Sequence, residues 1–257
     1  MALYKVIDSA ALDAGMTVVA DAIRAKAGLT DPLVWPDGFK SAVENIQSGG
    51  GAKEPYIEET YDANGNLIDV NLVGYTAIRP YAFYVCSNLA LTSLPSGLTS
   101  IGESAFYTCP NLALTSLPSG ITSIEASAFQ NCKSIALTIL PSGLTSIENN
   151  TFNNCSNLAL ISLPSGLTSI GKQAFRACRK LALNSLPSGL TSIGDYAFQN
   201  CTGLTSITFQ SKPTVISSSA FSGCTNLKTI NVPWASGEVA NAPWGATNAT
   251  INYNYTG

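Results

Sequence analysis

Hydrophobic positions recur along most of the chain at a fixed 23-residue step. Four ladders keep this step: Ile78, Ile101, Ile124, Ile147, Ile170, Ile193 and Ile216; Phe83, Phe106, Phe129, Phe152, Phe175, Phe198 and Phe221; Cys86, Cys109, Cys132, Cys155, Cys178, Cys201 and Cys224; and Leu89, Leu112, Ile135, Leu158, Leu181, Leu204 and Leu227. A unit this short cannot bury its apolar side unless a neighbour stacks on it. The pattern therefore predicts a solenoid with one coil per repeat.

Each coil is expected to contain one parallel β-strand, placed near residues 89–94 in the first repeat and at equivalent positions in the others. A proline such as Pro95 follows this segment, and proline suits a strand end because it cannot donate a ladder hydrogen bond. The glycine two places later, Gly97, allows a sharp turn. Strands in register would bring each phenylalanine onto the phenylalanines of the adjacent coils.

The repeat carries the motif Ile-Gly-x-x-Ala-Phe-x-x-Cys-x-x-Leu, as at residues 101–112 and 193–204. This motif resembles the BspA-like class of bacterial leucine-rich repeats, and the likeness covers about residues 67 to 233. Five central coils depart from the usual strand pattern, reading Leu-Ala-Leu-Thr-Ser-Leu in the first of them, residues 89–94. The resemblance implies a curved solenoid among mostly surface-exposed binding proteins, and it implies no catalytic activity.

Both ends of the repeat array carry segments suited to caps. Residues 56–77 predict a β-hairpin around the turn Asn64-Gly65, because Asn-Gly is a strong two-residue turn signal. Residues 233–257 contain Pro233-Trp234, Pro243-Trp244 and Ile251-Asn-Tyr253-Asn-Tyr255. These segments are expected to break the regular step and to seal the last coil with aromatic side chains; a ligand-stacking site is the alternative. Between these caps, residues 78–232 are assigned to the leucine-rich repeats.

The N-terminal part is of another kind. Residues 1–48 show helical spacing of apolar residues in two stretches, which predicts a two-helix module for attachment or oligomerisation, and residues 49–55 form a glycine-rich linker. Part of this module resembles the N-terminal segments of some bacteriophage tail-associated proteins, through the sequence Ala-Asp-Ala-Ile-Arg-Ala-Lys-Ala-Gly at residues 20–28. The predicted fold class is thus a leucine-rich-repeat solenoid, mainly β, with a small N-terminal two-helix module.

Composition and charge exclude several classes of protein. Only 11% of residues are charged, the net charge is −3 and there is no histidine, so the basic footprint of a nucleic-acid binder is missing. No apolar run approaches the roughly 20 residues of a membrane helix, so membrane insertion is not expected. No secretory signal is readable in this chain, which leaves two expected locations, a virion or the extracellular surface of a cell.

The cysteines do not have the spacing of a metal site. Zinc sites use cysteine and histidine at short spacing, whereas here one cysteine occurs per repeat. An odd number in one ladder favours seven buried thiols that act as small apolar residues. We expect no metal, no cofactor and no catalytic residue.

Two rows of positions are candidates for binding, and the positions beside the fixed cysteine vary most between coils. The strand-side row is Thr92, Thr115, Thr138, Ile161 and Asn184, and the Cys-flanking row is Tyr84, Tyr107, Gln130, Asn153 and Arg176. The strand-side row is slightly favoured because leucine-rich repeats commonly bind through their strand face. One coil carries a basic group, Lys172, Arg176, Arg179 and Lys180, which is interpreted as a solvated face, with contact to an anionic partner as the alternative.

These features predict a non-enzymatic recognition or adhesion protein that contacts a protein or a cell-surface glycan, with virion-associated receptor binding as its narrower form. It could form homo-oligomers through residues 1–48. One alternative is a bacterial cell-surface adhesin. Another is a polysaccharide-acting solenoid enzyme, for which Glu103, Glu125 and Glu148 would supply the carboxylates, although a solvated acidic edge explains them better.

Overall fold

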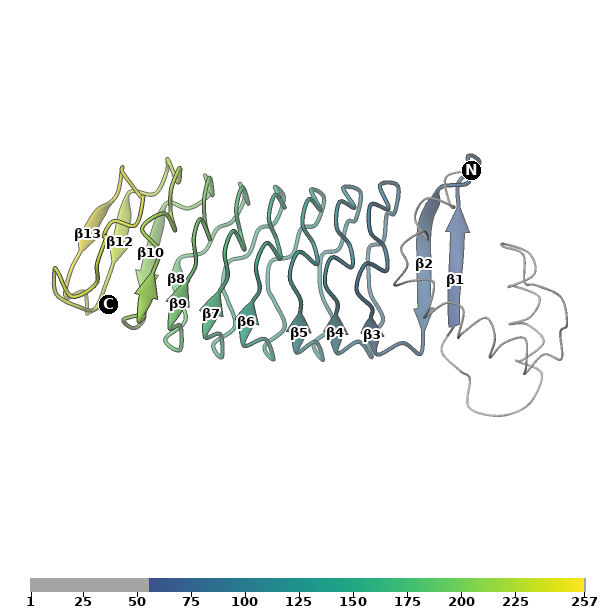
Figure 1. Ribbon diagram of the computed structural model, residues 1–257, viewed down its shortest axis with the longest axis horizontal. Helices are drawn as coiled ribbons and strands as arrows, with labels where there is room; N and C mark the ends of the chain where they lie inside the picture. Colours follow the sequence, from purple (N-terminus) through teal and green to yellow (C-terminus); the bar gives the residue numbers. More distant parts are fainter. Residues whose placement is uncertain (1–55, 257) are drawn as a thin grey trace, which may run out of the picture.

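The computed structural model describes residues 56–256, which form a single elongated solenoid (Figure 1). The two-helix module expected for residues 1–48 and the linker at 49–55 lie outside the described residues. The strands are β1 (Tyr56–Tyr61), β2 (Leu67–Val73), β3 (Ala77–Ile78), β4 (Ser100–Ile101), β5 (Ser123–Ile124), β6 (Ser146–Ile147), β7 (Ser169–Ile170), β8 (Ser185–Leu186), β9 (Ser192–Ile193), β10 (Ser206–Phe209), β11 (Val215–Ile216), β12 (Thr229–Asn231) and β13 (Thr250–Asn252). Within residues 56–256, we find no helix with the length and apolar character needed to cross a bilayer.

The coils stack through parallel pairing in a constant register. Three sheets run along the solenoid, in the orders β3-β4-β5, β11-β9-β7-β6 and β13-β12-β10-β8. Equivalent residues of successive repeats are partners, as in Ile101 with Ile124 and Ile170 with Ile193. The last pair, β12 with β13, joins Ile230 to Ile251 and so uses a slightly shorter step. The predicted parallel solenoid of 23-residue repeats is confirmed.

The position of the strand within the coil differs from the expectation. In the first four coils, residues 89–94 and their equivalents form no strand, and each of these segments keeps a bond to the preceding coil, such as the Ala113 N–H that donates to the Leu91 carbonyl. The strands lie later in the repeat, at the Ser-Ile pairs of β4 to β7 and β9. The predicted placement is wrong there because two exposed residues in succession, Thr115 and Ser116, interrupt the alternation of inward and outward side chains that a strand requires.

The core consists of the repeated ladders. Phe106 to Phe221 are all fully buried, and successive rings of the stack that begins at Phe83 lie 5.1 to 5.7 Å apart between centroids, within 13° of parallel. This confirms that each phenylalanine packs on its counterparts in the neighbouring coils. Offset stacking of this kind adds about 0.5–1.5 kcal/mol per pair to the burial of the ring.

In the turns around each phenylalanine, successive backbone N–H groups donate alternately to the next coil and to their own coil. In the second coil, the N–H groups of Ser104, Phe106 and Thr108 donate to carbonyls of the next coil, while those of Ala105 and Tyr107 donate within their own coil. This arrangement places two residues at positive φ in each of the first six coils, in this coil Ser104 at 52° and Thr108 at 56°. The left-handed region is unfavourable for residues other than glycine and asparagine, so the pairing between coils stabilises a costly backbone.

The two ends of the stack are covered differently. β1 and β2 form an antiparallel hairpin around Gly65, and the Ile68 carbonyl accepts a hydrogen bond from the Ala90 N–H of the first coil. At the other end, Trp244 is fully buried, and its indole Nε1 donates to the Ala240 carbonyl at 2.9 Å. The expected break in the step is only partial, because Trp244 lies one regular repeat step after Phe221 and β13 adds a further parallel strand.

Candidate functional site

The whole strand-side row is exposed to solvent. Thr92, Thr115, Thr138, Ile161 and Asn184 are all exposed. Ile161 is 55% exposed, and its N–H donates to the Thr138 carbonyl in the preceding coil, which brings these two positions together. Ile139, beside Thr138 in sequence, is 59% exposed. The sequence analysis did not single out Ile139, although isoleucine at a position held by serine in the adjacent coils is a visible signal.

The Cys-flanking row is exposed only in part. Asn153 is 5% exposed, and its side-chain amide donates to Asn150 Oδ1 at 3.1 Å and to Gln173 Oε1 at 3.4 Å. Arg176 is half-buried, and its Nε donates to Gln199 Oε1 at 2.8 Å. Gln130 is also half-buried. The middle of this row therefore connects coils to one another, and Asn153 is not available to a partner.

The first coils present an aromatic surface that the sequence analysis recognised only in part. Tyr84 and Tyr107 stack with centroids 4.8 Å apart and an angle of 8° between the rings. Tyr81, which was not among the predicted residues, lies against Tyr84 with centroids 5.9 Å apart and an angle of 59°. Both Tyr81 and Tyr84 are exposed, and so is Val85. We call Tyr81, Tyr84, Val85 and Tyr107 the tyrosine patch.

Three basic residues of the fifth coil do not belong to either row. Arg179 and Lys180 are exposed at the turn that follows Cys178, and Lys172 is exposed on the turn after β7. Within residues 56–256, the one ion pair joins Lys212 Nζ to Glu238 Oε2 at 2.6 Å, so neither Arg179 nor Lys180 is neutralised by a described carboxylate. They form a solvated basic turn.

The cysteines form an internal ladder of thiols. All seven are free, and six of them are buried, while Cys86 in the first coil is half-buried. Each buried thiol donates to a phenylalanine carbonyl of the preceding coil, as Cys109 Sγ does to Phe83 O at 3.0 Å. Burial raises the pKa of every thiol, to about 11 for Cys86 and about 12 for Cys224. The predicted burial is confirmed for six of the seven thiols, whereas Cys86 is half-buried. The six buried thiols are hydrogen-bond donors, and not only the small apolar residues that the sequence predicted.

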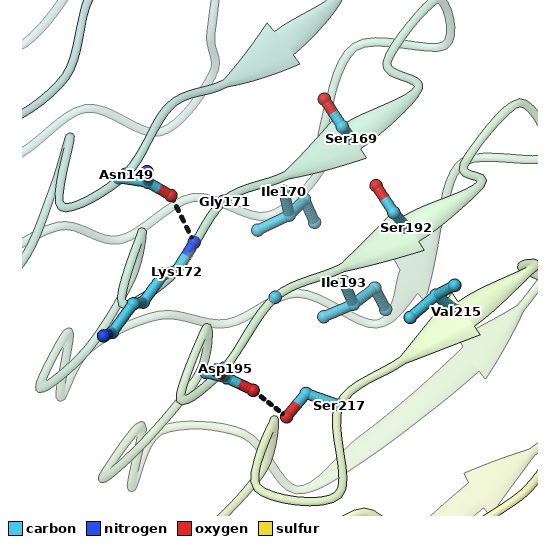
Figure 2. Close-up of a pocket in the computed structure, with 11 residues that line it drawn as sticks. Asn149, Ser169, Ile170, Gly171, Lys172, Ser192, Ile193, Asp195, Val215 and Ser217 are labelled. Atoms are coloured by element: carbon cyan, nitrogen blue, oxygen red, sulfur yellow. Dashed lines mark hydrogen bonds between the residues drawn. The ribbon is translucent and has the colours of Figure 1, made fainter.

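An open groove of about 450 Å³ runs along β7, β9 and β11 (Figure 2). Figure 2 shows Ile170 and Ile193 side by side on its floor, with Ser169 and Ser192 beside them. At one end Asp195 Oδ1 accepts a hydrogen bond from Ser217 Oγ. Its lining combines three aliphatic side chains, Ile170, Ile193 and Val215, with serine hydroxyls and the polar or charged Asn149, Lys172 and Asp195. The groove brings together none of the residues predicted for binding.

The three glutamates considered for catalysis lie on the outer edge of the coils. Glu103 and Glu125 are exposed and Glu148 is half-buried. Glu148 Oε1 accepts a hydrogen bond from Ser146 Oγ at 2.6 Å, and Glu125 accepts one from Ser123. Their environment is that of solvated carboxylates on a turn, and the groove of Figure 2 includes none of them.

Comparison with known proteins supports the repeat architecture. The BspA type leucine rich repeat region matches the chain over residues 76–188 and 124–242, in six copies. The chain belongs to the BspA-type leucine-rich-repeat family. A leucine-rich-repeat protein of T. pallidum (TpLRR) is 27% identical, with a TM-score of 0.52, and the match covers 66% of this chain and 87% of that one. A leucine-rich repeat protein from Bacteroides ovatus is 25% identical, with a TM-score of 0.45, over 71% of this chain and 47% of the other. No curated protein sequence matches the chain.

Membership of the BspA-type family is consistent with a protein-binding or adhesion surface. In this BspA-type protein the repeated apolar positions build the core.

Proposed function

We propose that this BspA-type protein is a non-enzymatic recognition protein that binds a protein or a cell-surface glycan through its strand-side row. The observation that carries the proposal is the complete exposure of Thr92, Thr115, Thr138, Ile161 and Asn184 beside ladders that are buried. The ladder residues stabilise the stack, whereas these five side chains lie outside the core, so they are free to contact a partner.

The centre of the row supports this assignment. Ile139 and Ile161 expose aliphatic side chains on adjacent coils, which costs solvation free energy and stabilises nothing within the solenoid. Exposed apolar residues gathered at one place are typical of interaction surfaces. The surrounding threonines and Asn184 supply hydroxyl and amide groups for hydrogen bonds at the rim of such a contact.

Substitution of the row gives the direct test. Ile161→Arg and Thr138→Arg place a bulky charge on the proposed surface, and Ser142→Arg is the matched control on the exposed turn of the same coil. Binding of the labelled protein to a panel of bacterial cells and to a glycan array is measured first for the parent chain. We expect the first two variants to lose at least tenfold in affinity and the control to keep it. Equal binding by all three would refute the proposed surface.

Enzymatic activity on polysaccharides is the alternative that this proposal rejects. BspA-type repeats are typically non-enzymatic, and the exposed positions of Glu103 and Glu125 support the same view. Incubation with the bound glycan, followed by mass analysis of the products, should show no cleavage. Turnover that disappears in Glu125→Gln would restore the enzyme as the better description.

The place where the protein acts is proposed more narrowly as the surface of a virion or phage-like particle, where it would bind a receptor on the host cell. The likeness of residues 20–28 to bacteriophage tail-associated proteins supports this location. The resemblance of the repeats to bacterial surface proteins supports a cell-surface adhesin instead. Immunogold labelling of particles and of producing cells distinguishes the two, because only one of the surfaces should carry the protein.

A further inference from the structure

The tyrosine patch is separate from the strand-side row and has no evident role in stability. Tyr81, Tyr84 and Val85 are 43%, 39% and 45% exposed. Most matched coil positions elsewhere are held by smaller or polar residues, such as Gln130 and Asn153 at the position of Tyr84, with Tyr196 at the position of Tyr81 as an exception. Three large side chains are therefore left in water at the first coils, where polar ones would serve the solenoid equally well.

The backbone under the patch adds a second, independent observation. Val85 has a φ of 59°, and Tyr81 has a φ of 60°. The other residues at the Val85 position are Thr108, Asn131, Asn154, Ala177, Asn200 and Gly223. Asparagine and glycine tolerate this conformation, whereas valine is among the residues least suited to it. An exposed valine in a strained backbone loses stability without gaining buried contacts, a combination that is typical of functional surfaces.

The charge around the patch indicates the chemistry of its partner. Residues 56–125 contain six acidic residues and one basic residue, Arg79, whereas residues 126–256 contain three acidic and seven basic residues. The Tyr81 N–H donates to the Glu103 carbonyl at 2.9 Å, which places Glu103 beside Tyr81, and the charge of Glu103 raises the pKa of the Tyr81 phenol. The patch therefore lies beside an exposed carboxylate in the acidic part of the solenoid.

The arrangement of the rings leaves aromatic faces to which a cation can bind. Tyr84 and Tyr107 cover each other's facing sides, with centroids 4.8 Å apart. Tyr81 and Tyr84 are inclined at 59° and cannot cover one another in this way. A guanidinium or ammonium group is attracted to such tyrosine faces when it lies within about 6 Å of a ring centroid, and nearby carboxylates strengthen the attraction.

We propose that the tyrosine patch is a second binding site, specific for an arginine- or lysine-rich polypeptide segment whose cationic side chains lie against Tyr81 and Tyr84 and are paired by Glu103. This second site rests on the proposed function only in that the chain is a binding protein, because its residues and its partner differ from those of the strand-side row. Aliphatic portions of the same segment would cover Val85, and tyrosines are well suited to such contacts because they bury a large area at a small cost in side-chain entropy.

The test uses the full chain and a labelled peptide of repeating Arg-Gly-Ser as the probe. Its controls are the same peptide with citrulline, an uncharged analogue, in place of arginine, and a Glu-Gly-Ser peptide. By fluorescence anisotropy, we expect the arginine peptide to bind at least tenfold more tightly than either control. Tyr81→Ala and Tyr84→Ala should each weaken it about fivefold, and Glu103→Gln should weaken it as well.

The chain offers a matched control variant. Tyr196 occupies the coil position of Tyr81 five coils later, with a φ of 57° and similar exposure, so Tyr196→Ala should leave peptide affinity unchanged. Tyr84→Leu, which keeps an apolar contact with Tyr107 but removes the aromatic face, should behave like Tyr84→Ala. Thermal unfolding verifies that each variant is folded.

Several results would overturn the proposal. The first is that the arginine peptide does not bind the parent chain, or that the citrulline peptide binds with equal affinity. The second is that Tyr196→Ala and Tyr81→Ala lose the same amount of affinity for the arginine peptide. The third is that a glycan binds in a Tyr81-dependent way while the arginine peptide fails to bind. Ile161→Arg should not remove peptide binding by this site. Loss of cell binding in Ile161→Arg together with failure of the arginine peptide would refute the tyrosine site alone and leave the proposed function standing.

Discussion

The Cys132 thiol donates a hydrogen bond to the Phe106 carbonyl oxygen, 2.9 Å away in the preceding coil. The same bond recurs for Cys109, Cys155, Cys178, Cys201 and Cys224, at 2.9 to 3.0 Å. Two of the repeated ladders are thus joined to each other from coil to coil. A buried thiol with a fixed acceptor explains a cysteine at this position better than a small apolar side chain alone would.

The thiols should react in a defined order. Because the thiolate is the reactive form, and burial raises the thiol pKa in every coil, we expect no rapid labelling of the six buried cysteines in the native protein. Cys86, half-buried in the first coil, should be modified first and slowly. Iodoacetamide labelling followed by peptide mass mapping measures the order. Fast modification of Cys155 without denaturant would contradict the buried ladder.

Stability should fall in alkaline solution. The ordinary thiol pKa is 9.0, and the folded chain raises it to about 11 for Cys86 and higher for the buried thiols of the middle coils. A group that keeps its proton longer in the folded state contributes fully below the unfolded pKa, and the contribution is lost as the pH rises toward the folded one. Urea unfolding should show constant stability up to about pH 9 and then a loss of about 1.4 kcal/mol per pH unit for each buried thiol.

The alkaline effect has a simple control. Cys155→Ala removes one titrating group from the middle of the ladder, so the slope above about pH 9 should become shallower by the share of one thiol. Stability at neutral pH should fall as well, because the Phe129 carbonyl loses its donor. An unchanged alkaline slope would show that other groups cause the loss.

Truncation of the phenylalanine stack should be costly at its centre. Phe152 is fully buried between Phe129 and Phe175, with centroid distances of 5.6 and 5.7 Å. We expect Phe152→Ala to lower the free energy of unfolding by about 3–5 kcal/mol, since it leaves a cavity that the rigid coils cannot close. Phe152→Leu should cost less because it fills part of that space. Chemical unfolding of both variants tests the order.

One substitution should stabilise the protein. Ala177 has a φ of 58° at a position where Asn131 and Asn154 form a side-chain ladder, Asn154 Nδ2 donating to Asn131 Oδ1 at 3.0 Å. Ala177→Asn introduces a residue that tolerates this backbone and can extend the ladder, so we expect a gain of about 0.5–1 kcal/mol. Ala177→Val should destabilise by a similar amount. A lower Tm for the asparagine variant would contradict the interpretation.

Removal of residues 1–51 should leave the solenoid intact. Val70 and Leu72 of the hairpin are buried in the same core as the coils, so residues 56–256 contain their own N-terminal cover. We expect the shortened chain to be a monomer with a nearly unchanged Tm, and the full chain to be a homo-oligomer. Light scattering and calorimetry measure both. A monomeric full-length protein combined with destabilised repeats in the shortened chain would refute the proposed attachment module.

The stacking of the coils could be predicted from the sequence alone, because identical side chains at a constant spacing indicate that each packs on its counterparts in the adjacent coils. Phe129, Cys132 and Ile124 each lie on their counterparts in the adjacent coils, as their spacing of one repeat requires. The candidate site was predictable only as two rows. The two rows differ in solvent exposure, because Thr138 is exposed whereas Asn153 is buried and donates a hydrogen bond to a neighbouring coil.

The sequence by itself therefore determined the repeat, its step and the residues that face the core, since burial of a recurring apolar position depends only on periodicity. The tertiary structure decided which backbone segments pair and which side chains stay exposed. Strand β10 forms where Ile207 and Phe209 alternate with Ser206 and Thr208. In the second coil, by contrast, Leu112 and Leu114 are followed by two exposed residues, and the strand forms instead at Ser123–Ile124. Backbone pairing needs two coils to approach within hydrogen-bond distance along several residues, and that approach depends on how all the coils pack together.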